Sequence, residues 1–100
     1  MRISKLQNDI LVTLVALESM DHREKVPATV LLTILNSNRE ANDQAKVFGA
    51  ALRLSLKTLA SNKLVRQFKN IVNGELSYLL TNDGRNIGVE VMAKRECEQT

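Results

Sequence analysis

The dipeptide Asn73-Gly74, which separates two short apolar segments at residues 64–72 and 75–81, constrains the fold most. Asn and Gly both tolerate the positive φ angles of a type I′ turn, and Asn-Gly is the strongest short-range signal for a hairpin. We therefore predict an antiparallel β-hairpin here. Apolar and polar residues alternate imperfectly in both segments, so the sequence leaves open which face of the hairpin is buried.

The first helix is expected over residues 4–19. Ser4 and Gln7 have the spacing of a capping box, and apolar residues recur every three or four positions. The second half of the helix is apolar almost all round, which predicts burial on two sides. The second side can face another subunit or other helices of the same chain, and we favour the subunit interface.

A charged connector at residues 21–25 leads to a second helix. Val26 can supply a very short edge strand. Pro27 suits the first turn of a helix, because the N–H that it lacks would have no partner there. We expect this second helix to end near Asn36.

The third helix should be the longest and should end near residues 61–62, but its start is open. Ser37 with Glu40 has the spacing of a second capping box; alternatively, Asn42 or Asp43 caps the helix after a longer loop. The predicted core stripe contains Phe48, Leu52, Leu56 and Leu59, joined by Ala51 and Ser55. The predicted exposed strip, at a spacing of three or four, contains Arg39, Asn42, Lys46, Ala50, Arg53 and Lys57.

A last helix, capped by Thr81 or Asn82, should run to about Lys94, although its two glycines weaken it. One hundred residues, of which 44% are hydrophobic, suffice for one domain with a real core. We therefore expect a single domain over residues 1–94 and a polar tail over residues 95–100.

Positive charge is concentrated in residues 44–73, which contain no Asp or Glu. The basic residues of this stretch are Lys46, Arg53, Lys57, Lys63, Arg66 and Lys69. The remaining seventy residues carry eight basic and eleven acidic side chains, so the net charge of +3 is unevenly distributed. Such a block attracts polyanions by Coulomb steering and counterion release, although a solvated helix and hairpin would have the same composition.

The order helix, short strand, helix, helix, hairpin, helix describes a mainly α fold with a small β-hairpin. It resembles the winged helix-turn-helix regulators of the MarR-like and PadR-like groups. Residues 59–66 (LASNKLVR) are similar to the end of their recognition helix and the entry to the wing, and residues 78–85 (YLLTNDGR) are similar to the wing exit. The resemblance covers about residues 4–92. The turn of these families usually contains a glycine where Asn62-Lys63 stands here.

The resemblance implies a transcriptional regulator that binds double-stranded DNA, with the third helix in the major groove and the hairpin, or wing, on the backbone. The residue types fit, because Arg, Lys, Asn and Gln read base edges and Lys, Arg and Asn bind phosphates. The predicted groove residues are Asn42, Gln44, Lys46 and Arg53, joined by Arg39 if the helix starts early. The predicted phosphate contacts are Lys57 and Lys63, and the wing set is Arg66, Lys69, Asn70 and Asn73.

Two further interpretations concern partners. A winged-helix protein-interaction module within a larger assembly is the main alternative to DNA binding, because fold alone does not define function and a broadly apolar first helix suits such a module. A DNA-binding regulator of this kind should form a homodimer through its first and last helices. It should then read two half-sites about one helical turn apart.

The sequence shows no residue pattern that is typical of a catalytic or cofactor-binding site. His22 is the single histidine and lies in the charged connector, and the sequence pattern offers Cys97 no histidine or metal partner. We expect no enzymatic activity, cofactor, metal or small-molecule substrate. No apolar run approaches the roughly 18 residues of a membrane span. A single cysteine favours a reducing cytoplasm, where the protein would associate with the nucleoid.

Overall fold

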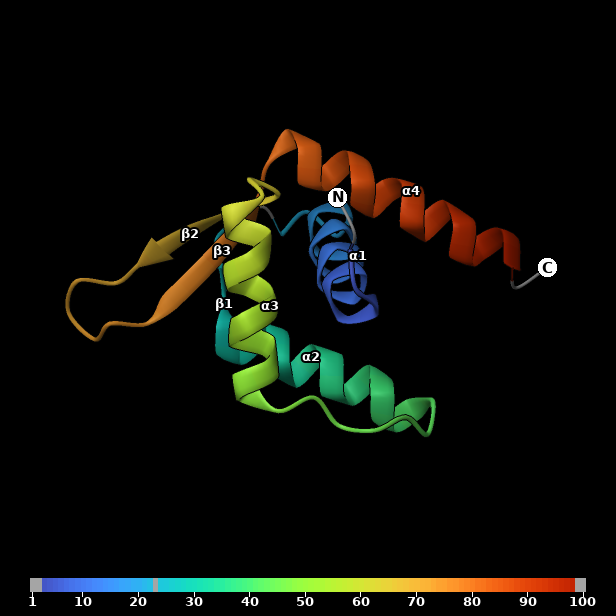
Figure 1. The fold of residues 1–100 in the computed structure, drawn as a ribbon, viewed down its shortest axis with the longest axis horizontal. Coiled ribbons are helices and arrows are strands. Elements are labelled where there is room, and N and C mark those ends of the chain that lie inside the picture. The colour runs from blue at the N-terminus through green and yellow to red at the C-terminus, as the bar shows by residue number, and fades with distance from the viewer. Residues whose placement is uncertain (1–2, 23, 99–100) are drawn as a thin grey trace.

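The computed structural model describes residues 3–22 and 24–98, which form four helices and a three-stranded sheet (Figure 1). The elements are α1 (Lys5–Ser19), β1 (Val26–Pro27), α2 (Ala28–Ala41), α3 (Gly49–Ser61), β2 (Val65–Lys69), β3 (Leu76–Leu80) and α4 (Asn82–Glu98). The sheet is antiparallel, in the order β1-β3-β2. Arg23 of the predicted connector, and Gln99 and Thr100 of the predicted tail, lie outside the described residues.

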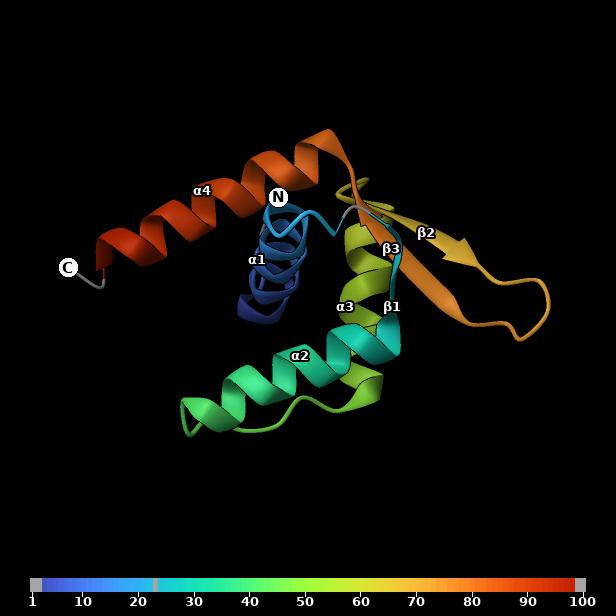
Figure 2. The same cartoon turned by 180° about the vertical axis from the view of Figure 1, so that it is seen from behind.

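The first helix is central, with α4 above it, α2 below it and α3 beside it in the view of Figure 1; Figure 2 shows the same arrangement from behind. The predicted capping box is present: the Gln7 N–H donates to Ser4 Oγ at 3.2 Å, and the Ser4 N–H donates to Gln7 Oε1 at 3.3 Å. Ile10 and Leu11 are fully buried. Helices of the same chain therefore cover the apolar second half of α1. The sequence had left this arrangement open as the alternative to a subunit interface.

The predicted hairpin is formed by β2 and β3, and Val26 forms the predicted edge strand by pairing with Tyr78 of β3. The buried face of the sheet contains Val65, Tyr78 and Leu80, each 7% exposed or less. The Tyr78 hydroxyl donates a hydrogen bond to Gln67 Oε1 at 3.2 Å, across the two strands. Burial raises the pKa of the Tyr78 phenol.

The alkaline stability of the fold should depend on Tyr78. The unfolded phenol ionises near pH 10, whereas the buried phenol keeps its proton to higher pH, so the unfolded state loses its proton first. The contribution of this group to the free energy of unfolding is therefore intact below pH 10 and is lost as the pH rises toward the pKa of the folded state. Denaturant titrations on both sides of pH 10 should show a smaller alkaline loss for Tyr78→Phe than for the wild type. Equal losses would contradict the prediction.

The second helix is longer than predicted, because it continues to Ala41 instead of ending near Asn36. Ser37 and Glu40 therefore lie inside α2, and the capping box predicted for them at the start of the third helix is wrong. The chain leaves α2 at Asp43, which has a left-handed backbone with a φ of 54°. Such a conformation cannot be continued as a right-handed helix.

A loop replaces the helix start that was predicted at Asn42 or Asp43, since α3 begins only at Gly49. Asn36 holds this loop with both ends of its amide. Its Nδ2 donates to the Val47 carbonyl at 3.1 Å, and its Oδ1 accepts the Val47 N–H at 2.7 Å. The backbone groups of Val47 are therefore occupied by a side chain of α2 and cannot join a helix that starts earlier.

The last helix begins at the predicted cap. The Thr81 hydroxyl accepts the Gly84 N–H at 3.1 Å and donates to the Lys63 carbonyl at 2.7 Å. The helix continues to Glu98, so the end expected near Lys94 is wrong. Its C-terminal turns extend past α1 in both ribbon views (Figures 1 and 2).

The glycines of α4 allow this helix to approach the rest of the molecule closely. A Cβ atom on Gly84 would lie 1.9 Å from the Leu64 carbonyl oxygen, and a Cβ atom on Gly88 would lie 2.6 Å from Val15 Cγ2. Both distances are far shorter than van der Waals contact. The loss of helix propensity at these two positions is therefore the cost of close packing.

Two groups of ion pairs join α1 to neighbouring helices. The Arg85 guanidinium of α4 donates two hydrogen bonds to the Glu18 carboxylate, at 2.7 and 3.0 Å. The Asp9 carboxylate accepts from Arg39 of α2 at 3.2 Å and from Arg95 of α4 at 2.5 Å. These pairs fix the helical layer around α1 and leave α3 and the hairpin to form the opposite side of the molecule (Figure 1).

Candidate nucleic-acid interface

The third helix has a buried face and a solvent face. Leu52, Leu56 and Leu59 of the predicted core stripe are buried. The exposed residues of the helix are Ala50, Ala51, Arg53, Leu54, Lys57 and Ser61. The prediction that placed Ala51 in the core stripe is therefore wrong. Arg53 and Lys57 are one helical turn apart, so they project from the same strip of the surface, as predicted.

Phe48 does not join the core, and the prediction that placed it there is wrong. Its side chain is 76% exposed, whereas the preceding Val47 is 7% exposed. Phe48 is the N-cap of α3 and has an extended backbone, so helical spacing does not align it with Leu52. Leu54, which the sequence analysis did not single out, is 68% exposed. Its separation of two residues from both Leu52 and Leu56 is a rotation of about 200°, and this spacing could have placed it on the solvent side.

Three predicted groove residues lie in the loop before α3 and not on the helix. Asn42, Gln44 and Lys46 are all exposed. The Asn42 amide is turned back toward α2, where it donates to the Asn38 carbonyl at 2.8 Å. Gln44 and Lys46 therefore remain the loop residues whose polar ends are directed to the surface just ahead of α3.

Arg39 lies on α2 and is engaged inside the fold. Its guanidinium pairs with Asp9 at 3.2 Å, and its Nη1 donates to the Ala45 carbonyl at 3.0 Å. The side chain is only 18% exposed. Arg39 therefore supports the loop that contains Lys46 and does not add to the surface strip of α3.

The tip of the hairpin is a loop over residues 70–75, and the predicted type I′ turn at Asn73-Gly74 is wrong. Gly74 has a positive φ of 74°, but Asn73 does not have the positive φ that such a turn requires. Asn70 Oδ1 accepts the N–H groups of Val72 at 2.8 Å and of Asn73 at 3.4 Å. Asn73 Oδ1 accepts the Glu75 N–H at 2.9 Å. Both asparagines of the predicted wing set thus hold the loop in shape.

The strands of the hairpin present Arg66 and Lys69 to solvent. The Arg66 guanidinium lies 5.5 Å from the centroid of the Phe68 ring, and the Lys25 ammonium lies 5.0 Å from it. Both distances are in the range of cation–π attraction. Phe68 therefore helps to hold positive charge along β2.

Lys63 occupies the turn between α3 and β2 and is exposed. Its φ is 60°, a left-handed conformation in which the Cβ atom of an L-residue is crowded by the backbone. In the regulators that the sequence resembles, a glycine usually stands in this turn. The chain thus places a lysine where glycine has the lower conformational energy.

Replacing Lys63 with Gly should raise the free energy of unfolding by about 1 kcal/mol, because glycine adopts this φ without steric cost. The same change at Lys57, inside α3, should lower it by about 1 kcal/mol. Each variant loses one exposed lysine, so opposite signs in denaturant unfolding would isolate the backbone effect. A loss of stability in Lys63→Gly would show that the left-handed turn is not strained.

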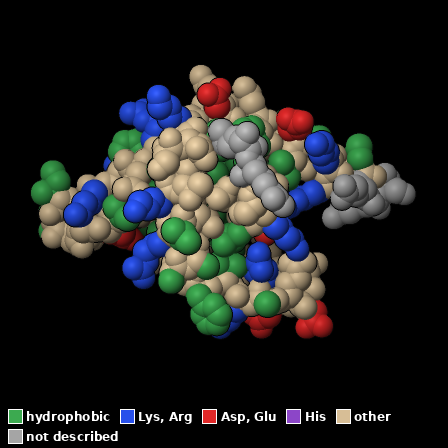
Figure 3. Space-filling view, in the orientation of Figure 1, with side chains coloured by type: hydrophobic (Ala, Val, Ile, Leu, Met, Phe, Trp, Pro, Cys, Tyr) green, Lys and Arg blue, Asp and Glu red, His purple; other side chains and the backbone are tan. Residues whose placement is uncertain are grey.

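The acid-free stretch maps onto consecutive parts of the surface: the loop before α3, α3, the turn and β2. In the view of Figure 3, Lys and Arg side chains lie over the wing and beside α3, and others lie near α1 and α4. Most of the Asp and Glu side chains visible on this face stand over α4 and at the end of α2. We call the surface of the acid-free stretch the basic surface, and its exposed cations are Lys46, Arg53, Lys57, Lys63, Arg66 and Lys69. Among the residues that the structure describes, none of the six is paired with a carboxylate.

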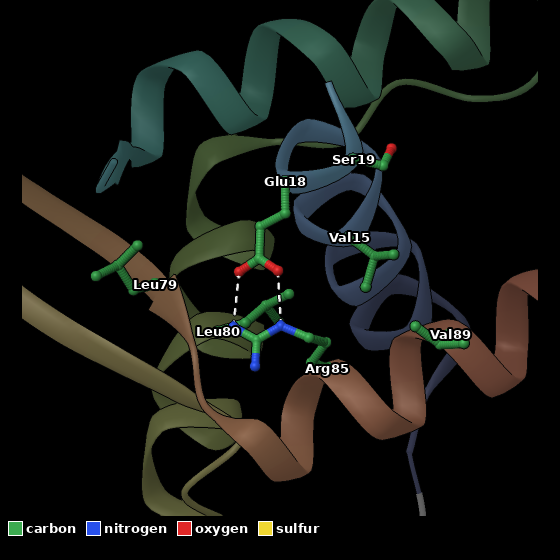
Figure 4. Close-up of a pocket in the computed structure, with 7 residues that line it drawn as sticks. All are labelled: Val15, Glu18, Ser19, Leu79, Leu80, Arg85 and Val89. Carbon is green, nitrogen blue, oxygen red and sulfur yellow. Dashed lines mark hydrogen bonds and ion pairs between the residues drawn. The ribbon is translucent and has the colours of Figure 1, made fainter. Parts of the chain in front are cut away.

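A cavity of about 520 Å³, which no sequence motif indicated, lies between α1, β3 and α4. The Arg85–Glu18 ion pair spans it, and Leu79, Val15 and Val89 flank the pair (Figure 4). The hydrogen bond to Glu18 raises the pKa of Arg85. The two charges therefore neutralise each other, and the remaining walls are largely apolar.

In the described part of the chain, no three His, Cys, Asp or Glu side chains are placed to hold a metal ion. The helices found there also lack the combination of length and hydropathy that crossing a membrane requires.

Together, α2 and α3 form a helix-turn-helix, the β2–β3 hairpin forms a wing beside it, and the molecule has the winged helix-turn-helix fold. The adhesin competence repressor from Streptococcus pyogenes is similar over 98% of this chain, with a TM-score of 0.71 and 18% identity. This chain spans 61% of the length of that repressor.

MepR, a transcription regulator of the Staphylococcus aureus multidrug efflux pump MepA, is similar over 97% of this chain and 62% of its own, with a TM-score of 0.63 and 17% identity. ZitR from Lactococcus lactis is similar over 95% of this chain and 54% of its own, with a TM-score of 0.63 and 16% identity. No family model and no curated protein matches the sequence. The matched structures share the fold of this chain, and the mainly α fold with a small hairpin that the sequence predicted is confirmed.

Proposed function

We propose that this chain binds double-stranded DNA sequence-specifically and regulates transcription. The observation that carries the proposal is the basic surface. Its exposed cations have no carboxylate partner among the described residues, and they follow α3, the turn and β2 without interruption by acidic residues. Duplex DNA is a polyanion whose major groove accommodates one α-helix. Winged-helix structures of similar shape are named as a repressor and a transcription regulator, which supports the same role here.

In this proposal α3 enters the major groove and the wing lies on the flanking backbone. Arg53, with Gln44 and Lys46 from the loop, reads base edges, because Arg and Lys match guanine and Gln matches adenine. The phosphate contacts are Lys57, Lys63, Arg66 and Lys69. Asn70 and Asn73 act indirectly, by holding the wing tip in shape.

Two residues of the sequence-based set are left out of the direct contacts. Arg39 is paired with Asp9 and largely buried. The Asn42 amide is bonded to the Asn38 carbonyl. A DNA contact by either residue would first break an interaction that the fold already makes, so the remaining residues are the better candidates.

A salt titration tests the proposal. Fluorescence anisotropy with a labelled duplex should show that the logarithm of the association constant falls linearly with the logarithm of the salt concentration, with a slope of about 0.9 per phosphate contact. Binding that does not depend on salt, or no binding to any duplex, would contradict the proposal and favour a protein-interaction module.

We also propose that two copies form a homodimer, with α4 as the main contact and α1 as a minor one. The C-terminal turns of α4 extend past α1 (Figures 1 and 2), and Val89 on α4 is 51% exposed. A two-fold dimer would recognise a roughly palindromic site with half-sites about one helical turn apart. Light scattering should give twice the chain mass of 11.2 kDa, and a mass of 11.2 kDa would count against the dimer.

We infer further that the chain acts by binding alone, inside the cell and at the nucleoid, where its DNA would be. The similar structures are named as regulators, and the exposed His22 is the single histidine of the sequence. Nuclease and phosphatase assays on bound DNA should give no turnover, and turnover abolished by His22→Ala would overturn this inference.

A further inference from the structure

We propose that Phe48 and Leu54 make α3 a reader of the thymine methyl group in the major groove. The inference rests on the proposed DNA binding and adds what the helix recognises. Phe48 is 76% exposed and Leu54 is 68% exposed, although both are large apolar side chains in a chain with a well-buried core. Ile71 and Val72 at the wing tip are more exposed still, but within the helix-turn-helix Phe48 and Leu54 are the most exposed large apolar side chains. They belong to the helix that the proposed function places in the groove.

The two side chains lie where a recognition helix meets base edges. Phe48 is the N-cap of α3, and Leu54 lies in the second turn of the helix. In helix-turn-helix proteins the N-terminal residues of the recognition helix contact the bases. Ala50 and Ala51, which are also exposed, precede Leu54 by one turn, so small side chains let the helix approach the groove floor.

The chemistry of the groove identifies the ligand group. The C5-methyl of thymine is the apolar group on the major-groove edge of the unmodified base pairs, and apolar side chains such as Phe and Ala contact it. Arg53 and Lys57 share the solvent face of α3 with Leu54, and Lys46 lies two residues before Phe48. Charge complementarity therefore favours a polyanion over an apolar protein partner, since the cores of protein interfaces are depleted of charged residues. Figure 3 shows hydrophobic side chains among Lys and Arg side chains on this part of the surface.

Deoxyuridine provides a direct test, because it lacks only the methyl group and keeps every hydrogen-bonding atom of thymine. Duplexes selected by the wild-type protein from a random library are made once with thymidine and once with deoxyuridine, and affinities are measured by anisotropy. Burial of one methyl group corresponds to about a fourfold change in affinity, so contacts with two methyls should make the deoxyuridine duplex about fifteenfold weaker. The Phe48→Ala/Leu54→Ala variant should bind both duplexes equally. The Val30→Ala variant, which loses exposed apolar surface on α2, should discriminate as the wild type does.

Several outcomes would overturn the inference. Equal affinity of the wild type for both duplexes, or selected sites without thymine, would show that the methyl group is not read, while DNA binding itself would stand. A double variant that still prefers thymidine would assign the preference to other residues. If the wild type binds the thymidine and deoxyuridine duplexes equally and the double variant is monomeric, Phe48 and Leu54 contact a second copy of the chain instead of the DNA. Failure of the wild type to bind any duplex would instead overturn the proposed function.

Discussion

Replacing Gly84 with Ala should lower the free energy of unfolding by about 3 kcal/mol, although alanine is the better helix former. The added Cβ would lie 1.9 Å from the Leu64 carbonyl oxygen and 2.8 Å from its carbonyl carbon. Both are backbone atoms, and the same carbonyl accepts the Thr81 N–H at 3.1 Å. The clash can be relieved only by moving the start of α4 or the turn after α3, so the whole junction of the wing should loosen.

Gly49→Ala is the matched control. The nearest atom to a Cβ on Gly49 is an Arg53 guanidinium nitrogen at 3.9 Å, and that side chain can move. This variant should be unchanged or up to about 1 kcal/mol more stable, because alanine is favoured in the first turn of a helix. Denaturant unfolding of both variants measures the difference between them. Similar stabilities would show that α4 does not depend on close contact at Gly84.

Features that depend on a single turn of chain could be predicted from the sequence. The caps at Ser4 and Thr81 and the leucine stripe of α3 are set by residues three or four apart, and the structure confirms them. The short edge strand predicted at Val26 is also confirmed, although its partner, Tyr78, lies 52 residues further along the chain. For the caps and the leucine stripe, the interaction that defines the feature lies within the spacing that the sequence pattern measures.

The start of α3 could not be predicted, because it depends on a contact between residues eleven apart. Ser37 and Glu40 satisfy the capping-box spacing, but Asn36 uses its side chain to occupy both backbone groups of Val47. The wing tip was mispredicted for a similar reason. The Asn-Gly signal assumes a turn with two central residues, whereas here backbone hydrogen bonds of Asn70 with Glu75 and Gly74 close a longer loop. The side chain of Asn70 supports this loop by accepting two further N–H groups.

The sequence predicted the kinds of residue in the candidate site better than it predicted which individual residues belong to the site. The cations of the acid-free stretch are all exposed, and none of them is paired with a carboxylate among the described residues. Arg39 lies outside the stretch, and Asp9, thirty residues away in the sequence, engages it. Phe48 was wrongly placed in the core, since an apolar residue at helical spacing normally belongs to the core. Only its place outside the helix exposes it.

The largest functional effect is expected for Lys46→Ala combined with Arg53→Ala. A specific base contact contributes about 1–3 kcal/mol, so the loss of two should weaken binding to the selected duplex by about 30-fold or more at fixed salt. If either residue binds phosphate instead, the slope of the salt dependence should also fall by about 0.9 per lost contact. Anisotropy titrations at several salt concentrations separate the two effects.

Lys5→Ala combined with Lys94→Ala is the control, because it removes the same two positive charges from a net charge of +3. Lys5 and Lys94 are exposed on α1 and α4, away from the basic surface. Because these helices are the proposed dimer contacts, light scattering must first show that the control variant has the mass of the wild type. Long-range attraction depends on net charge, whereas readout depends on where the charge is placed. A much larger loss for the α3 pair than for the control pair would therefore locate binding on α3 and its loop. Equal losses of affinity in the two variants would show that binding depends on net charge alone and that α3 does not recognise the DNA sequence.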